Sequence, residues 1–460
     1  METPVYDFVQ EYLHRNGVRF HMPGHKGKAF LGCEPFDITE IAGADVLSEA
    51  AGILGESQKN ASVLFHTGAT FYSTEGSSQC IKAMLAAALM KWKAASDDAG
   101  GKPWVLAARN VHRAMIDGCA LLDLEVEFLP FPLTDSICSV EVNPKTVEKM
   151  LERSVLPPVG VYLTSPDYLG VQCDIAEIAR VCHRHQVPLL VDNAHGAYLA
   201  FLEPSGHPIA LGADMCCDSA HKTLPVLTGG AYLHVSKACR ESFAPCIPKA
   251  LTLFGSTSPS YLTLQSLDLC NRYLAEDYRE RLAGCIRKIG QIKRQMEKKH
   301  LVIKKGEPLK IVLDTAASGY HGSEIAQELR EFMCSQDTAG IECEYADDHF
   351  LVLMLTPENE ERDFAHLREW LEITRLHQTK APLASPPGVV KAGRRRLSIR
   401  EAVLSPSEMI PVSMAQGRIL AQETVSCPPA VPIGISGEEV TEEMVALFQA
   451  YGIEEIAVCR

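Results

Sequence analysis

Short apolar segments alternate with helix-forming segments through the first half of the chain, and this order limits the fold more than any other feature. Apolar and β-branched runs are typical of buried strands, and the segments between them repeat apolar residues at helical spacing. This alternation predicts an α/β fold with a mostly parallel sheet covered by helices on both faces. The expected strands are residues 103–107, 126–131, 160–166 and 188–192, and the expected helices are residues 80–94, 143–154 and 174–185.

Polar residues follow several of the expected strands. The residues in question are His112, Thr164, Asp192 and Lys222. In sheets of this kind, ligands bind beyond the carboxyl ends of the strands. We therefore expect these side chains to line one pocket.

Lys222 stands on a tight connection between two apolar runs, residues 213–218 and 231–235, with Ser219 and His221 beside it. A lysine in this position can bind the aldehyde of a cofactor covalently, and pyridoxal phosphate is the usual one. The alternative is an ordinary surface lysine on a loop. The remaining motifs favour the cofactor.

Gly76, Ser77 and Ser78 precede a clear helix. Their free N–H groups and hydroxyls, together with the positive end of the helix dipole, are suited to a phosphate group. Plain capping of the helix by serine is the alternative.

The cofactor ring also has candidate partners. Asp192 ends a strand, and a carboxylate there can keep the pyridine nitrogen protonated. His112 can stack on one face of the ring, and Ala194 can press on the other. Because the cofactor needs a lysine, a carboxylate, a stacking ring and a phosphate site, their joint presence predicts pyridoxal phosphate more strongly than any one of them.

Composition limits the partners and the compartment. A formal net charge of −14 argues against nucleic acid or an anionic membrane as a partner. Sixteen cysteines occur without a Cys-x-x-Cys pair, and the first residues lack the features of a signal peptide, so we expect a cytoplasmic protein with free thiols. The sequence shows no metal-ligand spacing and no apolar run of the ~20 residues that a membrane span needs.

A chain of 460 residues is too long for one compact core and predicts several domains. A polar, proline-rich stretch predicts a linker, and residues 391–396 form a basic cluster that we expect to be solvated or to contact an acidic neighbour. The expected parts are an N-terminal segment (1–60), a cofactor-binding domain (61–255), linking helices (256–300), a small α+β domain (301–376), a linker (377–397) and a C-terminal domain (398–460).

Several motifs together resemble the bacterial ornithine/lysine/arginine decarboxylase family, whose members have the fold type I architecture of pyridoxal-phosphate enzymes. The matching stretches are Phe20-His21-Met22-Pro23-Gly24-His25-Lys26-Gly27, Asp37-Ile38-Thr39-Glu40, Arg109-Asn110-Val111-His112, Val191-Asp192-Asn193-Ala194-His195-Gly196 and Ser219-Ala220-His221-Lys222-Thr223-Leu224-Pro225. The resemblance extends from about residue 5 into the C-terminal segment. It also implies that this chain lacks the extra N-terminal domain of the longer, ring-forming members.

The resemblance implies roles for individual residues. Lys222 would carry the cofactor, Asp192 would pair with the pyridine nitrogen, and His195 would lie nearby and assist proton transfer. Thr257 and Ser258 would reach the phosphate of a neighbouring subunit, so the expected minimum assembly is a homodimer. The phosphate of the chain's own cofactor would be held by Ser77, Ser78, Ser219 and His221.

The expected activity is decarboxylation of arginine, lysine or ornithine, with arginine and lysine favoured. The alternatives are another pyridoxal-phosphate reaction, as in an aminotransferase or a carbon–sulfur lyase, and a non-catalytic binding protein. Three departures from the family pattern, at Asn193 (usually glutamate), Cys80 and Ala430, bear on the substrate. Glu438 and Glu439 are acidic candidates for contact with the cationic end of a substrate.

Overall fold

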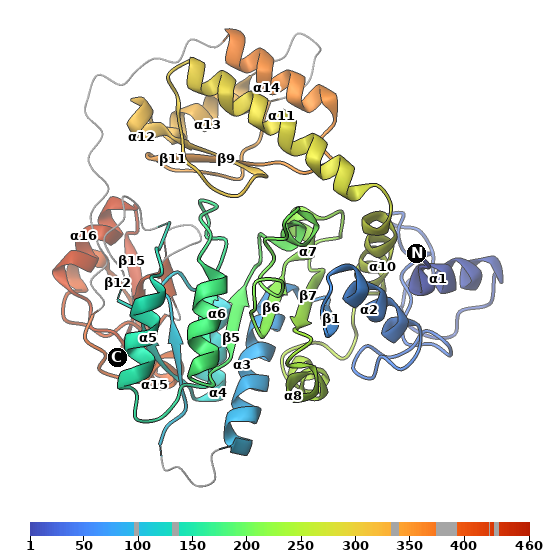
Figure 1. Cartoon of the computed structure of the whole chain (residues 1–460), viewed down its shortest axis with the longest axis horizontal. Helices are drawn as coiled ribbons and strands as arrows, with labels where there is room; N and C mark the ends of the chain where they lie inside the picture. The colour runs from blue at the N-terminus through green and yellow to red at the C-terminus, as the bar shows by residue number, and fades with distance from the viewer. Residues whose placement is uncertain (96–100, 131–137, 333–339, 374–392, 423, 427–431) are drawn as a thin grey trace.

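The computed structural model describes every residue except 96–100, 131–137, 333–339, 374–392, 423 and 427–431 (Figure 1). Most of the expected linker and Ala430 therefore lie outside the described residues. Among the described helices, none is long and apolar enough to cross a membrane.

A seven-stranded sheet forms the centre of the large domain. The five strands β6, β5, β4, β2 and β3 run parallel, whereas β7 is antiparallel to both of its neighbours, β6 and β1. This arrangement confirms the predicted α/β class with a mostly parallel sheet. The spatial order is β1 (Ala69–Ser73), β7 (Ala231–Val235), β6 (Met215–Asp218), β5 (Leu189–Asp192), β4 (Val161–Thr164), β2 (Trp104–Ala107) and β3 (Glu125–Phe128).

Helices cover both faces of this sheet because successive strand residues point to opposite sides. Leu163 and Val191 belong to the core under α5 and α6, whereas Tyr162 and Leu190 belong to the core under α3 and α4. Full burial on both faces explains why the strands read as continuous apolar runs. The covering helices are α3 (Gly76–Ala95), α4 (Arg113–Leu122), α5 (Pro144–Arg153) and α6 (Ile175–Arg184).

Two of the predicted helix starts have the expected caps. The side chain of Asn143 accepts a hydrogen bond from the Lys145 N–H at 2.9 Å, and that of Asp174 accepts one from the Glu177 N–H at 3.1 Å. Helix α3 begins at Gly76, four residues before the predicted start, so Gly76 and the two serines lie in its first turn.

The N-terminal helices are fastened to the linking helices by one buried carboxylate. Asp268 accepts hydrogen bonds from the N–H groups of Val5 and Tyr6 and from the hydroxyl of Ser57. These contacts join α1 and α2 to α10, because a helix start presents N–H groups without intrahelical partners. The elements are α1 (Pro4–His14), α2 (Ile53–Leu64), α8 (Arg240–Phe243), α9 (Ile247–Thr252), α10 (Tyr261–Ala275) and α11 (Tyr278–Lys298).

The small domain contains an antiparallel sheet of order β10-β11-β9-β8 with helices packed on it. In Figure 1 it lies above the large sheet, and the one-turn helix α7 (Ala220–Thr223) lies on the side of the large sheet that faces it. The elements are β8 (Val302–Ile303), β9 (Lys310–Asp314), α12 (Thr315–Ser318), α13 (Gly322–Glu331), β10 (Tyr345–Ala346), β11 (Phe350–Met354) and α14 (Glu361–Ile373).

The C-terminal segment packs beside the edge of the large sheet that carries β3. Its buried contacts with the large domain include the apolar side chains of Ile399 and Ile435 and the ion pair of Arg109 and Glu438. The ion pair has two N–O distances of 2.8 Å and almost no exposure of either side chain. The elements are α15 (Ile399–Leu404), β12 (Ser407–Pro411), β13 (Thr424–Ser426), β14 (Pro432–Ile435), α16 (Glu442–Ala450) and β15 (Glu455–Cys459).

The described part of the basic cluster contacts acidic neighbours, which is one of the two expected outcomes. Arg395 lies 3.3 Å from a carboxylate oxygen of Glu125, and Arg396 lies 2.7 Å from one of Glu439. Lys391 lies outside the described residues.

We expect Glu438→Gln to lower the free energy of unfolding by about 3–5 kcal/mol, because it leaves the buried Arg109 guanidinium without its counter-charge. Glu439→Gln is the matched control. It removes only the more exposed pair with Arg396 and should cost less than about 1 kcal/mol. Urea unfolding of both variants measures the difference. Equal midpoints would show that the buried pair stabilises the fold no more than the exposed pair does.

Candidate active site

The carboxyl ends of β4, β5 and β6 bring the predicted polar residues to one edge of the large sheet. Thr164 pairs in register with Asp192, and Asp192 with Cys217. His112 caps the start of α4, and the charges of Asp192 and Lys222 both act on the pKa of His112. The structure therefore gathers the side chains that the sequence predicted to share a pocket.

Lys222 lies on α7, and its Nζ is 3.0 Å from Nε2 of His195. Burial lowers the pKa of Lys222 from its ordinary value, although the charge of Asp192 opposes the shift. Burial also holds the pKa of His195 well below its ordinary value, and the charges of Lys310 and Lys222 add to the effect. A lysine with a lowered pKa is a better nucleophile, and a neutral histidine can accept its proton.

Tyr168 fixes the position of the His195 ring. The two rings meet edge to face with centroids 5.6 Å apart. The Tyr168 hydroxyl donates a hydrogen bond to Glu344 of the small domain at 3.0 Å. His195 is thus held between the large-domain lysine and a tyrosine that contacts the small domain.

We expect His195→Gln to lower the turnover rate about 100-fold if the imidazole moves a proton during the reaction. Because burial holds the pKa of His195 well below its ordinary value, the ring should add no ionisation to the pH–rate profile near neutral pH. The apparent pKa values of the profile should therefore be the same in the variant and the parent. Loss of an ionisation near neutral pH in the variant would contradict this assignment.

Asp192 is buried at the end of β5, with 2% of its surface exposed. Its Oδ2 accepts a hydrogen bond from the Tyr162 hydroxyl at 3.2 Å, and its Oδ1 accepts one from the Ala194 N–H at 3.2 Å. Burial and the neighbouring carboxylate raise the pKa of Tyr162 well above its ordinary value, so this phenol stays a donor. The Cys217 thiol adds a longer bond to Oδ1 at 3.8 Å, and the three donors hold the carboxylate in one orientation.

His112 is neutral and oriented. Its Nδ1 accepts a hydrogen bond from the Ala114 N–H at 3.1 Å, so this nitrogen carries no proton. Burial lowers the pKa of His112, in agreement with the neutral form. A neutral imidazole fixed at the start of α4 can stack on a flat ring.

The residues predicted to hold the phosphate (the phosphate cradle) lie together at the start of α3. The hydroxyl of Ser219 donates to that of Ser77 at 2.8 Å, which joins the residue before α7 to the first turn of α3. Gly76 has a φ of +72°, a conformation that favours glycine. Nδ1 of His221 hydrogen bonds to the carbonyl of Gly230 at 3.0 Å, which fixes the ring beside the cradle.

The residues at this edge fit pyridoxal phosphate. Five polar atoms here are buried without a hydrogen-bond partner: Oδ1 of Asn110, Oγ1 of Thr164, Oδ1 of Asn193, Nδ1 of His195 and Oγ1 of Thr223. Native proteins pair most buried polar atoms, so unpaired ones at the same edge indicate a bound polar group. The donor set also matches, with hydroxyls and a helix start for a phosphate and a carboxylate for a pyridine nitrogen.

Asn193, the first departure, takes part in a buried polar cluster under the site. Its Nδ2 donates to Asp218 at 2.7 Å, and the other oxygen of Asp218 lies 3.0 Å from Nε2 of His207 and 3.2 Å from Nε2 of His234. Burial opposes ionisation of Asp218, but the two histidines outweigh it and hold its pKa well below the ordinary value. The ligand atoms of His207, Asp218 and Cys216 lie within 4.8 Å of one another, a closeness that the hydrogen bonds account for. The carboxylate of Asp218, at the end of β6, thus lies beside Asn193, which follows β5.

The second departure, Cys80, lies in the core beneath the cradle. Its side chain is fully buried in the core under α3, and burial raises the pKa of its thiol to about 12. Cys80 therefore does not prevent the contact between Ser77 and Ser219.

Thr257 and Ser258 are exposed. Thr257 lines a cavity of about 420 Å³ with Gln79 and residues of the segment 46–50. Among the described hydrogen bonds, neither residue contacts Lys222 or Ser77 of its own chain. Their role toward a second subunit stays a prediction.

Glu438 and Glu439 are not free to contact a substrate in this structure. Glu438 is bound to Arg109 and Glu439 to Arg396. Sequence reasoning missed this because the buried partner of Glu438 lies 329 positions away.

The structure adds residues that the sequence did not single out. Asp218 ends a buried strand as Asp192 does, and the rule that selected Asp192 would have found it. Glu344 and Tyr168 carry no such signal, because both lie on irregular segments. The packing of the two domains brings Glu344 to Tyr168, which contacts His195.

The fold and the site define a pyridoxal-phosphate-dependent enzyme of fold type I. The chain belongs to the Orn/Lys/Arg decarboxylase family: the family described as "Orn/Lys/Arg decarboxylase, major domain" matches residues 3–333. It is thus a pyridoxal-phosphate-dependent decarboxylase.

Relatives and solved structures agree with this family. The chain is 27% identical to an arginine decarboxylase of Halalkalibacterium halodurans over 97% of this chain and 92% of the relative, and 26% identical to an arginine decarboxylase of Bacillus subtilis with the same coverage. The constitutive lysine decarboxylase of E. coli superposes with a TM-score of 0.77 at 15% identity, covering 100% of this chain and 82% of that one. This last similarity concerns the fold.

Proposed function

We propose that this enzyme removes the carboxyl group of a basic amino acid, arginine, lysine or ornithine, to give the corresponding amine and carbon dioxide. The observation that supports it is the contact of Lys222 with a neutral His195, at the same edge as the buried Asp192. Membership of the family and the names of the relatives favour arginine and lysine.

When bound, pyridoxal phosphate supplies an aldehyde that links to amines and a ring that accepts the electrons of the broken Cα–carboxylate bond. Lys222 would hold the cofactor through its Nζ, and Asp192 would keep the pyridine nitrogen protonated. His112 and Ala194 would lie on the two faces of the ring. The phosphate would be held by Gly76, Ser77, Ser78, Ser219 and His221.

His195 and Lys222 are the candidates for returning a proton to Cα. Nε2 of His195 and Nζ of Lys222 share one hydrogen bond, so a proton on either atom is available to the other. The lowered pKa of both groups favours release of that proton in a water-poor site.

Glu344 is our candidate for the partner of the substrate's distal cation. Its negative charge acts on Lys222, so it lies within electrostatic reach of the reacting end of the site. It accepts a hydrogen bond from Tyr168 and, among the described residues, forms no ion pair. An unpaired carboxylate facing the site would attract a cationic side chain and disfavour an acidic one.

We expect Glu344→Gln to raise the KM for arginine or lysine about tenfold or more, because a charge-assisted contact is lost, while kcat changes less. Glu342→Gln is the matched control. It removes the same charge two residues away, where Glu342 faces Arg330 at 3.4 Å. Steady-state kinetics of both variants check this, and equal KM values would exclude Glu344 as the recognition residue.

The test of the proposed activity is product analysis. The cofactor-loaded protein is incubated with arginine, lysine, ornithine, alanine and leucine, and the amines and carbon dioxide are measured. We expect at least one basic amino acid to be decarboxylated and the two neutral ones to be rejected, because charge is discriminated more strictly than chain length. Consumption of a neutral or acidic amino acid alone would overturn the proposal.

The two alternative reactions have less support. Aminotransferases and carbon–sulfur lyases generally hold a carboxylate with an arginine, and Arg109, which follows β2, is engaged by Glu438. The presence of both Lys222 and Asp192 disfavours a non-catalytic binding protein. The visible spectrum of the purified protein tests this last alternative. An absorption band of the bound cofactor favours an enzyme, and its absence favours a binding protein.

We also propose a homodimer, in which the exposed Thr257 and Ser258 reach the phosphate site of the second subunit. Sedimentation of the cofactor-loaded protein tests it, and full activity of a monomer would remove that role. A place in polyamine synthesis and a cytoplasmic location follow from the proposed reaction and from the free cysteines.

A further inference from the structure

A second cavity, of about 500 Å³, lies at the edge of the large sheet opposite to the active site. It is formed by α2, the start of β1 and the segment after β7. Because β7 is antiparallel to β6, its last residue, Val235, pairs with the first residue of β6, Met215, and with the first residue of β1, Ala69. The cavity is therefore separated from the phosphate cradle by the length of the strands.

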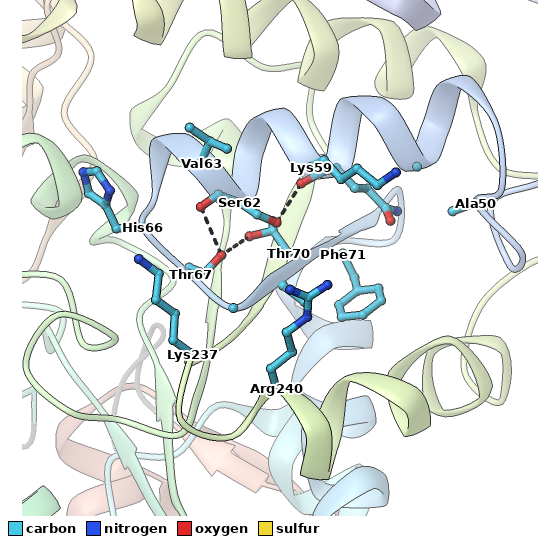
Figure 2. A pocket seen from close by; sticks show the side chains of 14 residues that line it. Ala50, Lys59, Ser62, Val63, His66, Thr67, Thr70, Phe71, Lys237 and Arg240 are labelled. Atoms are coloured by element: carbon cyan, nitrogen blue, oxygen red, sulfur yellow. Dashed lines mark hydrogen bonds between the residues drawn. The ribbon is translucent and has the colours of Figure 1, made fainter.

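The charge of the cavity is positive. Lys59, Lys237 and Arg240 line it together with His66, and no acidic residue belongs to its lining (Figure 2). None of these four side chains forms an ion pair or hydrogen bond within the part of the chain that the structure describes. All four side chains are exposed. In a chain with a net charge of −14, three cations around one hollow form a local positive patch that attracts an anion.

The floor of the cavity carries hydroxyl groups. Figure 2 shows Ser62, Thr67 and Thr70 in a row, with the hydroxyls of Thr67 and Thr70 2.8 Å apart. The Thr70 hydroxyl in turn contacts Nδ1 of the buried His234 at 2.8 Å. The Ser62 hydroxyl donates to the backbone carbonyl of Gln58 at 2.8 Å, and the Thr67 hydroxyl donates to that of Ser62 at 3.5 Å. The hydroxyls are therefore bonded within the chain and form a polar floor beside the cations.

We propose that this cavity binds a small molecule carrying a phosphate or pyrophosphate group. Phosphate oxygens accept hydrogen bonds from lysine and arginine side chains, and both kinds of cation line this cavity. The volume exceeds that of the phosphate group alone, and Ala50, Val63 and Phe71 provide apolar walls for the remainder of the ligand. A basic amino-acid substrate is repelled by the three cations, so the site is separate from substrate binding.

The experiment uses the cofactor-loaded protein, so that the phosphate cradle of the active site is filled. Pyrophosphate is titrated by calorimetry, with inorganic phosphate in a second series. We expect one pyrophosphate per chain, with phosphate weaker and both weakened by salt. In Lys237→Gln/Arg240→Gln, the affinity should fall about tenfold for each cation removed.

The control variant is Lys145→Gln/Lys149→Gln, which removes the same charge from exposed positions on α5. It should bind pyrophosphate as the parent does. The cofactor absorbance of both variants reports that the fold is intact. No binding by the parent, or equal affinity in the two double variants, would overturn the proposal. So would competition between pyrophosphate and the cofactor, which would place the anion in the active site.

Discussion

Lys222→Ala should lower turnover by at least about 10⁴-fold, since removal of a covalent nucleophile has effects of that size or larger. The nearest alternative amine is Lys310, and it is not free. Its Nζ lies 2.8 Å from Glu307 and donates to the backbone carbonyls of Asp167 and Tyr168. Among the described hydrogen bonds, no other lysine contacts His195. We therefore expect no other lysine to replace Lys222.

Borohydride reduction followed by peptide mapping gives the direct measurement. It should find the cofactor on the peptide that contains Lys222 in the parent and on no lysine in the variant. Lys222→Arg is the matched control, because it keeps the positive charge and loses the nucleophile; it should be as inactive as the alanine variant. Label on another lysine, or activity in the arginine variant, would refute the assignment.

Asp192→Asn should still bind the cofactor but lose about 10³-fold in turnover, the size of effect expected when a fixed charge that stabilises a transition state is removed. The reason is that the amide cannot hold the pyridine nitrogen in its protonated form. The altered protonation of the ring should also change the absorbance of the bound cofactor.

Tyr162→Phe separates the charge of Asp192 from its orientation. It removes the hydroxyl hydrogen bond to this carboxylate and leaves the carboxylate in place, with its bonds from the Ala194 N–H and the Cys217 thiol. We expect a loss of less than about tenfold, the value of one neutral hydrogen bond. Near-normal turnover in Asp192→Asn, or equal losses in the two variants, would show that Asp192 acts only in the structure.

The sequence predicted the large domain well because its signals are local. The strands that end at Thr164, Asp192 and Asp218 are buried on both faces, so each reads as an apolar run. Helix caps such as Asn143 and Asp174 bond to N–H groups no more than three residues further along the chain. The polar residues that follow parallel strands could then be assigned to one edge of the sheet from topology alone.

The rest of the site depends on contacts between distant segments. Glu344 approaches Lys222 only because the small domain packs over the large one, and the engagement of Glu438 depends on Arg109 of another domain. Neither contact leaves a periodic pattern in the sequence. The residues around Ala430, where the chain departs from the family pattern, lie outside the described part of the structure.

The pairing of Arg109 with Glu438 has a consequence for the synthesis of the protein on the ribosome. The two residues are 329 positions apart, and a ribosome adds about 5–20 residues per second. Tens of seconds therefore separate the synthesis of Arg109 from that of Glu438. The segment that contacts the Arg109 guanidinium through Glu438 and the carbonyl of Ile433 is also absent during that interval. The large domain can form its sheet in that time, but the surface that the C-terminal segment covers stays uncovered until nearly the whole chain has been translated.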